Sequence, residues 1–294
     1  MGQVHVINVV HTEHNWWDDG YTGLDEGTAL LLERFANLGA RHVTRIPITW
    51  CLYFGNGEKG PVTGTVNPDI IDVRKEFFRE RFKLGDEIGI HTHASDPKEQ
   101  PRFFKANAEK VESHGFPYPK THAPAWFYLD GSIFRALEAA RIEIDTGVLV
   151  GCGVVNHPRV KDLMVQDSSR RDRGDHRAFR PYHPDYEKIW EPGTSPIVEI
   201  PVFLSCEGIG ENPARFIEAF RKLWEHRDEV AVDIVQFFWH PFECMEQRTG
   251  GRINHSVIDG WCTLYSEIAS WNDIVFSTAC DAVVAWKWEK KKNP

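Results

Sequence analysis

The chain has 294 residues, 41% hydrophobic and 26% charged, which is enough apolar material for a sizeable core and argues against disorder. A formal net charge of -9, with an isoelectric point near 5.9, argues against a nucleic-acid-binding protein, which would carry a basic face. The sequence shows no secretory-signal pattern, no apolar run of roughly 18 residues that could span a membrane, and no CxxC pair among its six cysteines. We therefore expect a cytoplasmic protein with reduced thiols and without a membrane span.

Strand-like and helix-like segments alternate along nearly the whole chain. The pattern predicts strands at 4–10, 42–54, 87–91, 120–124, 142–146, 197–203, 232–239 and 274–277. It predicts helices at 27–38, 68–83, 97–113, 131–140, 213–226, 256–270 and 280–288. Such alternation indicates a parallel sheet covered by helices, and this many units favour closure into a barrel. We expect one domain over residues 1–294.

One region, at about 153–195, interrupts the alternation. It contains several prolines and a dense run of charged residues at 169–180, without sustained periodicity. A loop of this length in a compact domain is usually either functional or disordered. Two interpretations stay open here, a surface insertion or a loop that covers the substrate. In the second case Tyr182, His183, Tyr186 and Trp190 are the candidate contacts.

The segment Gly85–Ser95, GDEIGIHTHAS, carries a histidine pair at the end of a short apolar strand. Successive strand residues point to opposite faces, so His91 and His93, two positions apart, lie on the same side. Two neutral imidazoles so placed can share one metal ion. Structural histidines in the core or on the surface are the alternative explanation of this pattern.

Other predicted strands also end in polar side chains. The first strand runs into VVHTEHNWW, which places His11 and Glu13 at its end. His122 precedes Pro124 in the short strand expected at 120–124, and His240 follows VQFFW. Because parallel barrels collect the carboxyl ends of their strands on one rim, we expect these side chains to lie close together.

In the order of these motifs the chain resembles the polysaccharide deacetylases with a NodB-homology domain, carbohydrate esterase family 4. GDEIGIHTHAS is similar to the family's histidine motif, and APAWFYLDGSIFRALEAARIEIDTGV to its RxP motif and the segment that follows. IVEIPVF is similar to the segment that precedes the loop supporting the family's site, and FFWHPFE resembles the last motif, with its catalytic histidine. The resemblance runs from about Val4 to His240 and implies a distorted (β/α)7-type barrel.

The resemblance implies metal-assisted removal of acetyl from an N-acetylated sugar. Glu13 matches the family's metal-binding aspartate, His91 its first histidine ligand and His240 its catalytic acid. A divalent metal, zinc first of all, is the implied cofactor. The family's second histidine ligand would fall at Ser95, so we expect His93 to take that place.

Two further positions depart from the family pattern. His11 stands where the family has an aspartate base, and His122 where it has the arginine that orients this base. A neutral His11 could still accept a proton near pH 7, because an unperturbed imidazole titrates around 6.5. The hypothesis is thus a base at His11 that His122 orients.

The expected substrate is an N-acylated sugar or sugar-containing precursor in the assembly of a surface glycan such as an O-antigen. Trp16 and Trp126 are the candidates for contact with the sugar ring, together with Tyr182 of the irregular region. The alternative is a non-catalytic, carbohydrate-binding descendant of the deacetylase fold, since the replaced base and arginine also fit a lost activity. The sequence leaves the oligomeric state open.

Overall fold

Nine parallel strands form the centre of the computed structural model, which describes residues 2–38, 45–149, 175–205, 208–246 and 251–292. The strands are β1 (Gln3–His11), β2 (Thr49–Phe54), β3 (Glu87–Thr92), β4 (Thr121–Pro124), β5 (Ile144–Asp145), β6 (Val198–Glu199), β7 (Val202–Ser205), β8 (Val232–Trp239) and β11 (Ile274–Ser277). They follow the order β6-β5-β4-β3-β2-β1-β8-β7, and β11 pairs with the first half of β1. A separate hairpin joins β9 (Met245–Glu246) to β10 (Arg252–Ile253).

The sheet curls into a distorted barrel. Its edge strands β6 and β7 follow each other in the chain, and Leu149, just after β5, forms a parallel bridge to Val202 of β7. This bridge brings the two edges of the sheet together. The predicted (β/α) barrel is therefore confirmed, and all its strands end on the same rim.

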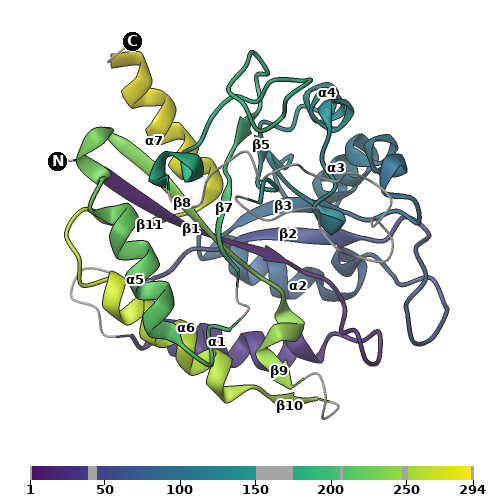
Figure 1. Ribbon diagram of the computed structural model, residues 1–294. Coiled ribbons are helices and arrows are strands. Elements are labelled where there is room, and N and C mark those ends of the chain that lie inside the picture. The colour runs from purple at the N-terminus through teal and green to yellow at the C-terminus, as the bar shows by residue number, and fades with distance from the viewer. Residues whose placement is uncertain (1, 39–44, 150–174, 206–207, 247–250, 293–294) are drawn as a thin grey trace.

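Helices surround the sheet (Figure 1). They are α1 (Ala29–Ala36), α2 (Ile70–Lys83), α3 (Phe104–Ser113), α4 (Gly131–Ala139), α5 (Pro213–Trp224), α6 (His255–Ile268) and α7 (Ala279–Lys292). Side-chain caps begin several of them; Asp130, for example, accepts hydrogen bonds from the backbone of Ser132 and Ile133 at the start of α4. Within the described part of the chain, no helix is both long and apolar enough to cross a membrane.

The strands separate two apolar cores. The outer core lies between the sheet and the helices, where side chains such as Val6, Trp50 and Ile90 are buried. The inner core contains Ile7 and Val9, and apolar residues of α7 pack against it. The backbone of α7 begins beside the first residues of β2 and β3, so this helix covers the amino end of the barrel. The candidate site lies at the opposite, carboxyl end of the barrel.

Two predicted elements are interrupted by proline. The helix expected at 97–113 consists of a short 3-10 segment, Pro97–Arg102, and then α3, because Pro101 lacks the N–H that a continuous helix needs. The strand expected at 197–203 is divided into β6 and β7 around Pro201, which cannot donate to the ladder.

Two other predictions fall partly on residues outside the described ranges. The strand expected at 42–54 begins only at Thr49 within the described residues, and 42–44 lie outside them. Of the irregular region at 153–195, residues up to 174 also lie outside the described ranges. Its remaining part contains a short helix, His176–Phe179, and pairs Tyr182 with Glu199 at the edge of the sheet.

Candidate metal centre

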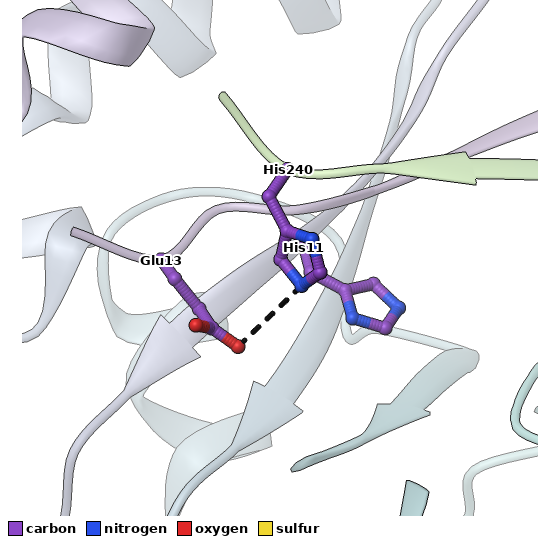
Figure 2. A group of neighbouring side chains, drawn as sticks. All are labelled: His11, Glu13 and His240. Carbon is purple, nitrogen blue, oxygen red and sulfur yellow. Dashed lines mark ion pairs between the residues drawn. The ribbon is translucent and has the colours of Figure 1, made fainter. Parts of the chain in front are cut away.

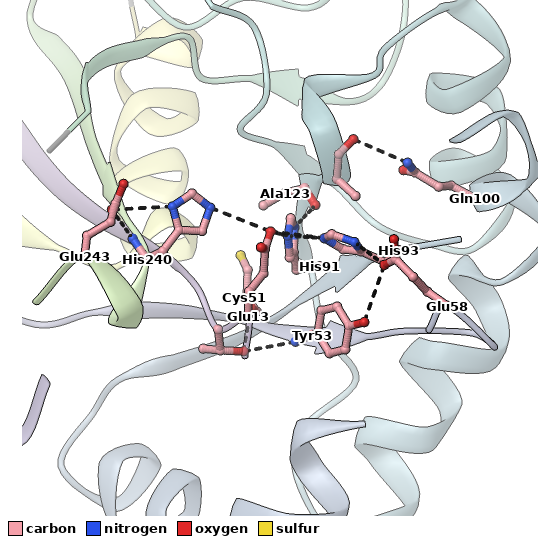
Figure 3. Close-up of polar contacts among 12 residues, drawn as sticks. Glu13, Cys51, Tyr53, Glu58, His91, His93, Gln100, Ala123, His240 and Glu243 are labelled. Atoms are coloured by element: carbon pink, nitrogen blue, oxygen red, sulfur yellow. Dashed lines mark hydrogen bonds and ion pairs between the residues drawn. The ribbon is translucent and has the colours of Figure 1, made fainter. Parts of the chain in front are cut away.

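Glu13, His91 and His93 meet at the carboxyl rim of the barrel (Figure 3). The Oε1 atom of Glu13 lies 2.9 Å from Nε2 of His91 and 3.1 Å from Nε2 of His93. The two Nε2 atoms are 2.9 Å apart. All three side chains are buried, with 8%, 1% and 2% of their surface exposed. The predicted ligands therefore present their donor atoms to one small volume.

Hydrogen bonds on the far side of each imidazole determine which nitrogen carries the proton. Nδ1 of His91 lies 2.9 Å from the carbonyl oxygen of Ala123, and Nδ1 of His93 lies 2.7 Å from Oε2 of Glu58. A carbonyl and a carboxylate only accept hydrogen bonds, so each Nδ1 carries the hydrogen. In their neutral forms, both Nε2 atoms then offer lone pairs toward the carboxylate of Glu13.

Three electron-pair donors without a proton between them repel one another unless a cation lies among them. Two imidazoles and one carboxylate are a donor set that suits zinc and other divalent first-row metals. The second hydrogen bond of each imidazole is also the usual support of a metal-binding histidine. The residues present therefore fit a divalent metal ion.

The local electrostatics favour the deprotonated ligands that metal binding requires. Burial alone would raise the pKa of the Glu13 carboxyl, but the surrounding histidines outweigh it and hold this pKa well below its ordinary value. Burial lowers the pKa of His91 to about 4, although its contact with Glu13 acts in the opposite direction. At neutral pH Glu13 is ionised and His91 is neutral.

His11 and His240 lie beside Glu13, one of the three residues of this centre (Figure 2). Nε2 of His240 is 3.7 Å from Oε1 of Glu13, and its Nδ1 is 3.4 Å from Oε2 of Glu243. Burial lowers the pKa of His240, but Glu243 and Glu13 outweigh it, so the pKa is raised. The His11 ring centroid lies 4.3 Å from that of His91. Burial, with His91 and His240 nearby, holds the pKa of His11 well below its ordinary value.

Aromatic side chains surround the entrance to the centre. The Trp126 ring lies 5.0 Å from that of His93, and the half-exposed Trp16, at 40%, lies 6.0 Å from Trp126. Trp126 and Phe127 have φ angles of 58° and 51°, a left-handed conformation that costs energy in bulky residues. This strained turn places Trp126 beside His93 and Phe127 beside His11.

Comparison with known proteins agrees with this architecture. A protein from Mycobacterium smegmatis assigned as a polysaccharide deacetylase superposes with a TM-score of 0.57, over 99% of this chain and 92% of its own, at 14% identity. A second protein assigned as a polysaccharide deacetylase, from Pseudomonas aeruginosa PAO1, superposes with a TM-score of 0.57, over 98% of this chain and 92% of its own, at 12% identity. The chain has the polysaccharide deacetylase fold.

The same fold also occurs in other proteins. A 4-alpha-glucanotransferase from Thermococcus litoralis superposes with a TM-score of 0.55, over 97% of this chain and 40% of its own, at 13% identity. No family model matches the sequence, and no curated protein matches it significantly. Function must therefore be argued from the site, because one fold supports several chemistries.

On this deacetylase fold His122 lies away from the centre. The sheet register pairs His122 with Ile90, the neighbour of His91, so its side chain is on the opposite face of the sheet. There it forms a 2.6 Å hydrogen bond to Asp145 and contacts the ring of Phe104 in α3. These contacts correct the expectation that His122 orients His11, because the two side chains lie on different faces.

The described contacts of Tyr182 are structural. It is buried, and its hydroxyl donates a hydrogen bond to the carbonyl of Ile189 in the same loop. Its contact with substrate stays a prediction. The sequence reasoning missed Glu58, whose carboxylate holds His93. The available signal was Asn56-Gly57, a pair typical of a tight turn, directly after a predicted strand.

Proposed function

We propose that this chain is a metal-dependent amidohydrolase that removes an acyl group from the nitrogen of an amino sugar. The observation that supports this proposal is the meeting of Glu13, His91 and His93 with lone pairs facing one another. Most buried polar atoms of a folded protein are paired with a donor or an acceptor, so three facing lone pairs favour a metal ion over a purely structural role. A surface-glycan precursor is the first substrate class to test.

Glu13 would hold the metal through Oε1, and His91 and His93 through Nε2. The chemistry that a divalent ion supplies at this position is Lewis-acid polarisation of the acyl carbonyl and of the attacking water. The surrounding histidines keep Glu13 ionised by lowering its pKa, and burial keeps His91 neutral by lowering its pKa.

His11 and His240 divide the proton transfers between them. Burial holds the pKa of His11 well below its ordinary value, so at neutral pH this imidazole is neutral and a weaker base than an unperturbed histidine. Its buried Nε2 has no hydrogen-bond partner among the described residues and is therefore placed to accept a proton from water. His240 has a raised pKa, and its Nε2 is directed toward the centre, so it can donate a proton to the departing amine. Trp16 and Trp126 would hold the sugar ring at the entrance.

The test is the release of acyl groups from a panel of N-acetylated and N-formylated amino sugars, free and nucleotide-linked, by protein loaded with zinc. We expect release of the acid together with a free amine, loss of the activity with a chelator, and its return with added zinc. His114→Ala removes a histidine at the end of α3 and should leave the activity unchanged. Zinc-loaded protein that binds these sugars but releases nothing would contradict the proposal and favour the carbohydrate-binding alternative.

A further inference from the structure

A tight turn follows directly after β2. Asn56 and Gly57 have φ angles of 46° and 86°, and the backbone N–H of Glu58 donates to the carbonyl of Gly55 at 2.8 Å. A turn with two central left-handed residues is favoured by Asn-Gly, because these residues adopt positive φ at low cost. The turn reverses the chain and brings Glu58 back toward Tyr53 and the metal centre (Figure 3).

The turn is attached to the strand end that carries His93. The side chain of Asn56 donates to the backbone carbonyl of His93 at 2.8 Å and to that of Phe54 at 3.1 Å. The backbone N–H of His93 in turn donates to the carbonyl of Phe54 at 2.7 Å. The turn and the His93 backbone therefore hold each other in a fixed position.

Glu58 is itself buried, and its Oε2 atom accepts hydrogen bonds from Nδ1 of His93 at 2.7 Å and from the Tyr53 hydroxyl at 3.4 Å. We propose that Glu58 is a positioning residue, which makes His93 a metal ligand by holding it as the Nδ1–H tautomer. This inference rests on the proposed metal centre. A carboxylate that accepts from Nδ1 also makes Nε2, the opposite ring nitrogen, a stronger electron-pair donor to a metal ion.

The two histidine ligands differ in how they are held. His91 depends on the backbone carbonyl of Ala123, which no side-chain substitution removes, whereas His93 depends on the side chain of Glu58. In the deacetylase family that the sequence resembles, the position of His93 holds no metal ligand. Glu58 thus supplies from a loop the support that lets a histidine at position 93 serve as a ligand.

The test measures the tautomers directly, by long-range proton–nitrogen NMR of full-length, metal-free protein labelled with 15N-histidine. At pH 8 the spectra report, for each imidazole, which ring nitrogen carries a hydrogen. Wild type, Glu58→Ala, Glu58→Gln and Lys59→Ala are compared, and zinc affinity is measured on the same samples. Lys59 is the exposed neighbour of Glu58 and controls for disturbance of the turn.

We expect both His91 and His93 to be Nδ1–H in wild type and in Lys59→Ala. In Glu58→Ala, His93 should change to Nε2–H while His91 stays unchanged, and zinc affinity should fall 10- to 100-fold, roughly the usual cost of losing such a partner. Glu58→Gln should retain the Nδ1–H form in part, because its amide oxygen still accepts.

A His93 that is Nε2–H in wild type, or that stays Nδ1–H in Glu58→Ala, would overturn the inference. Unchanged zinc affinity in Glu58→Ala would do the same. The unchanged His91 signal shows that a variant is folded. If wild type shows the expected tautomers and binds no zinc, the proposed function fails while the role of Glu58 in orienting His93 is retained.

Discussion

Two groups of histidine and glutamate side chains lie at opposite ends of the barrel and offer similar ligands. Glu13, His91 and His93 form the group at the carboxyl end. At the amino end, just before β8, His176 and His226 lie 2.7 and 2.9 Å from the two carboxylate oxygens of Glu229, and their rings stack at 3.8 Å. By residue type and distance alone, both groups could hold a metal.

Their surroundings separate the two groups. At the amino end, Arg180 donates to Glu229 at 3.0 Å, and the two partly exposed imidazoles can place an N–H on each carboxylate oxygen. The carboxylate oxygens of Glu229 therefore have hydrogen-bond donors without a metal ion. At the carboxyl end the far nitrogens face a carbonyl and a carboxylate, so the neutral imidazoles direct lone pairs, and no hydrogen, toward Glu13. Ligand types in proximity are therefore weaker support for a metal site than buried donors with fixed tautomers.

The largest expected effect comes from removing a ligand at the carboxyl end. His91→Ala should lower zinc affinity more than roughly 10²-fold, since a metal held by three protein groups loses one of them. His176→Ala is the matched control and should bind zinc like wild type. Elemental analysis after dialysis checks both. Loss of zinc from His176→Ala, with zinc retained in His91→Ala, would show that the metal binds at the amino end and not at the carboxyl end.

His11→Ala should separate catalysis from metal binding. We expect kcat to fall about 10²- to 10⁴-fold, the usual contribution of a general base, while zinc content stays at the wild-type level. Kinetics and metal analysis on one preparation check this. Full activity would remove His11 from the mechanism, and loss of zinc would make it a ligand.

His240→Gln should affect only substrates whose leaving group needs a proton. For an N-acyl sugar we expect kcat to fall by about 10²- to 10³-fold, because the amide side chain of Gln cannot release a proton. An activated aryl ester, whose leaving group departs unprotonated, should be cleaved nearly as fast as by wild type. Equal losses on both substrates would rule out the role of His240 as acid.

Trp16→Ala should weaken binding without changing the chemical step. Trp16 is half-exposed at the entrance, so we expect KM to rise about 3- to 10-fold, the usual worth of one aromatic contact, with kcat unchanged. Initial-rate measurements over a range of sugar concentrations check this. A fall in kcat at unchanged KM would place Trp16 in the catalytic machinery instead.

Glu229→Gln should have the smallest effect. The contacts of Glu229 with His176, His226 and Arg180 lie at the surface, where ion pairs contribute little. Zinc content and kcat should match wild type, and thermal unfolding should change only slightly. A loss of zinc in this variant would show that the amino-end group binds metal.

Sequence periodicity was sufficient to predict that Glu13, His91 and His93, at the ends of two strands, lie close together. His91 and His93 lie on one side of the sheet because strand residues alternate, and Glu13 joins them because β1 and β3 end at the same rim. Glu58 could not be predicted in this way. Its position depends on a turn whose attachment to His93 exists only once β2 and β3 are paired.

The predicted position of His122 was wrong for a related reason. A histidine at a strand end is as easily on the outer face as on the inner one, and only the pairing of Ile90 with His122 decides between them. Proline, in contrast, was visible in the sequence. Pro101 lies within the 3-10 segment before α3, and Pro201 lies between β6 and β7, so their missing N–H groups are a sequence signal for both interruptions.

The central claim is that Glu13, His91 and His93 hold one divalent metal ion. X-ray absorption at the zinc edge of protein loaded with one equivalent of zinc tests it most directly. The structure predicts a first shell of nitrogen and oxygen at about 2.0–2.1 Å with the scattering of two imidazoles. A sulfur shell, an imidazole count other than two, or protein that takes up no zinc would contradict the claim.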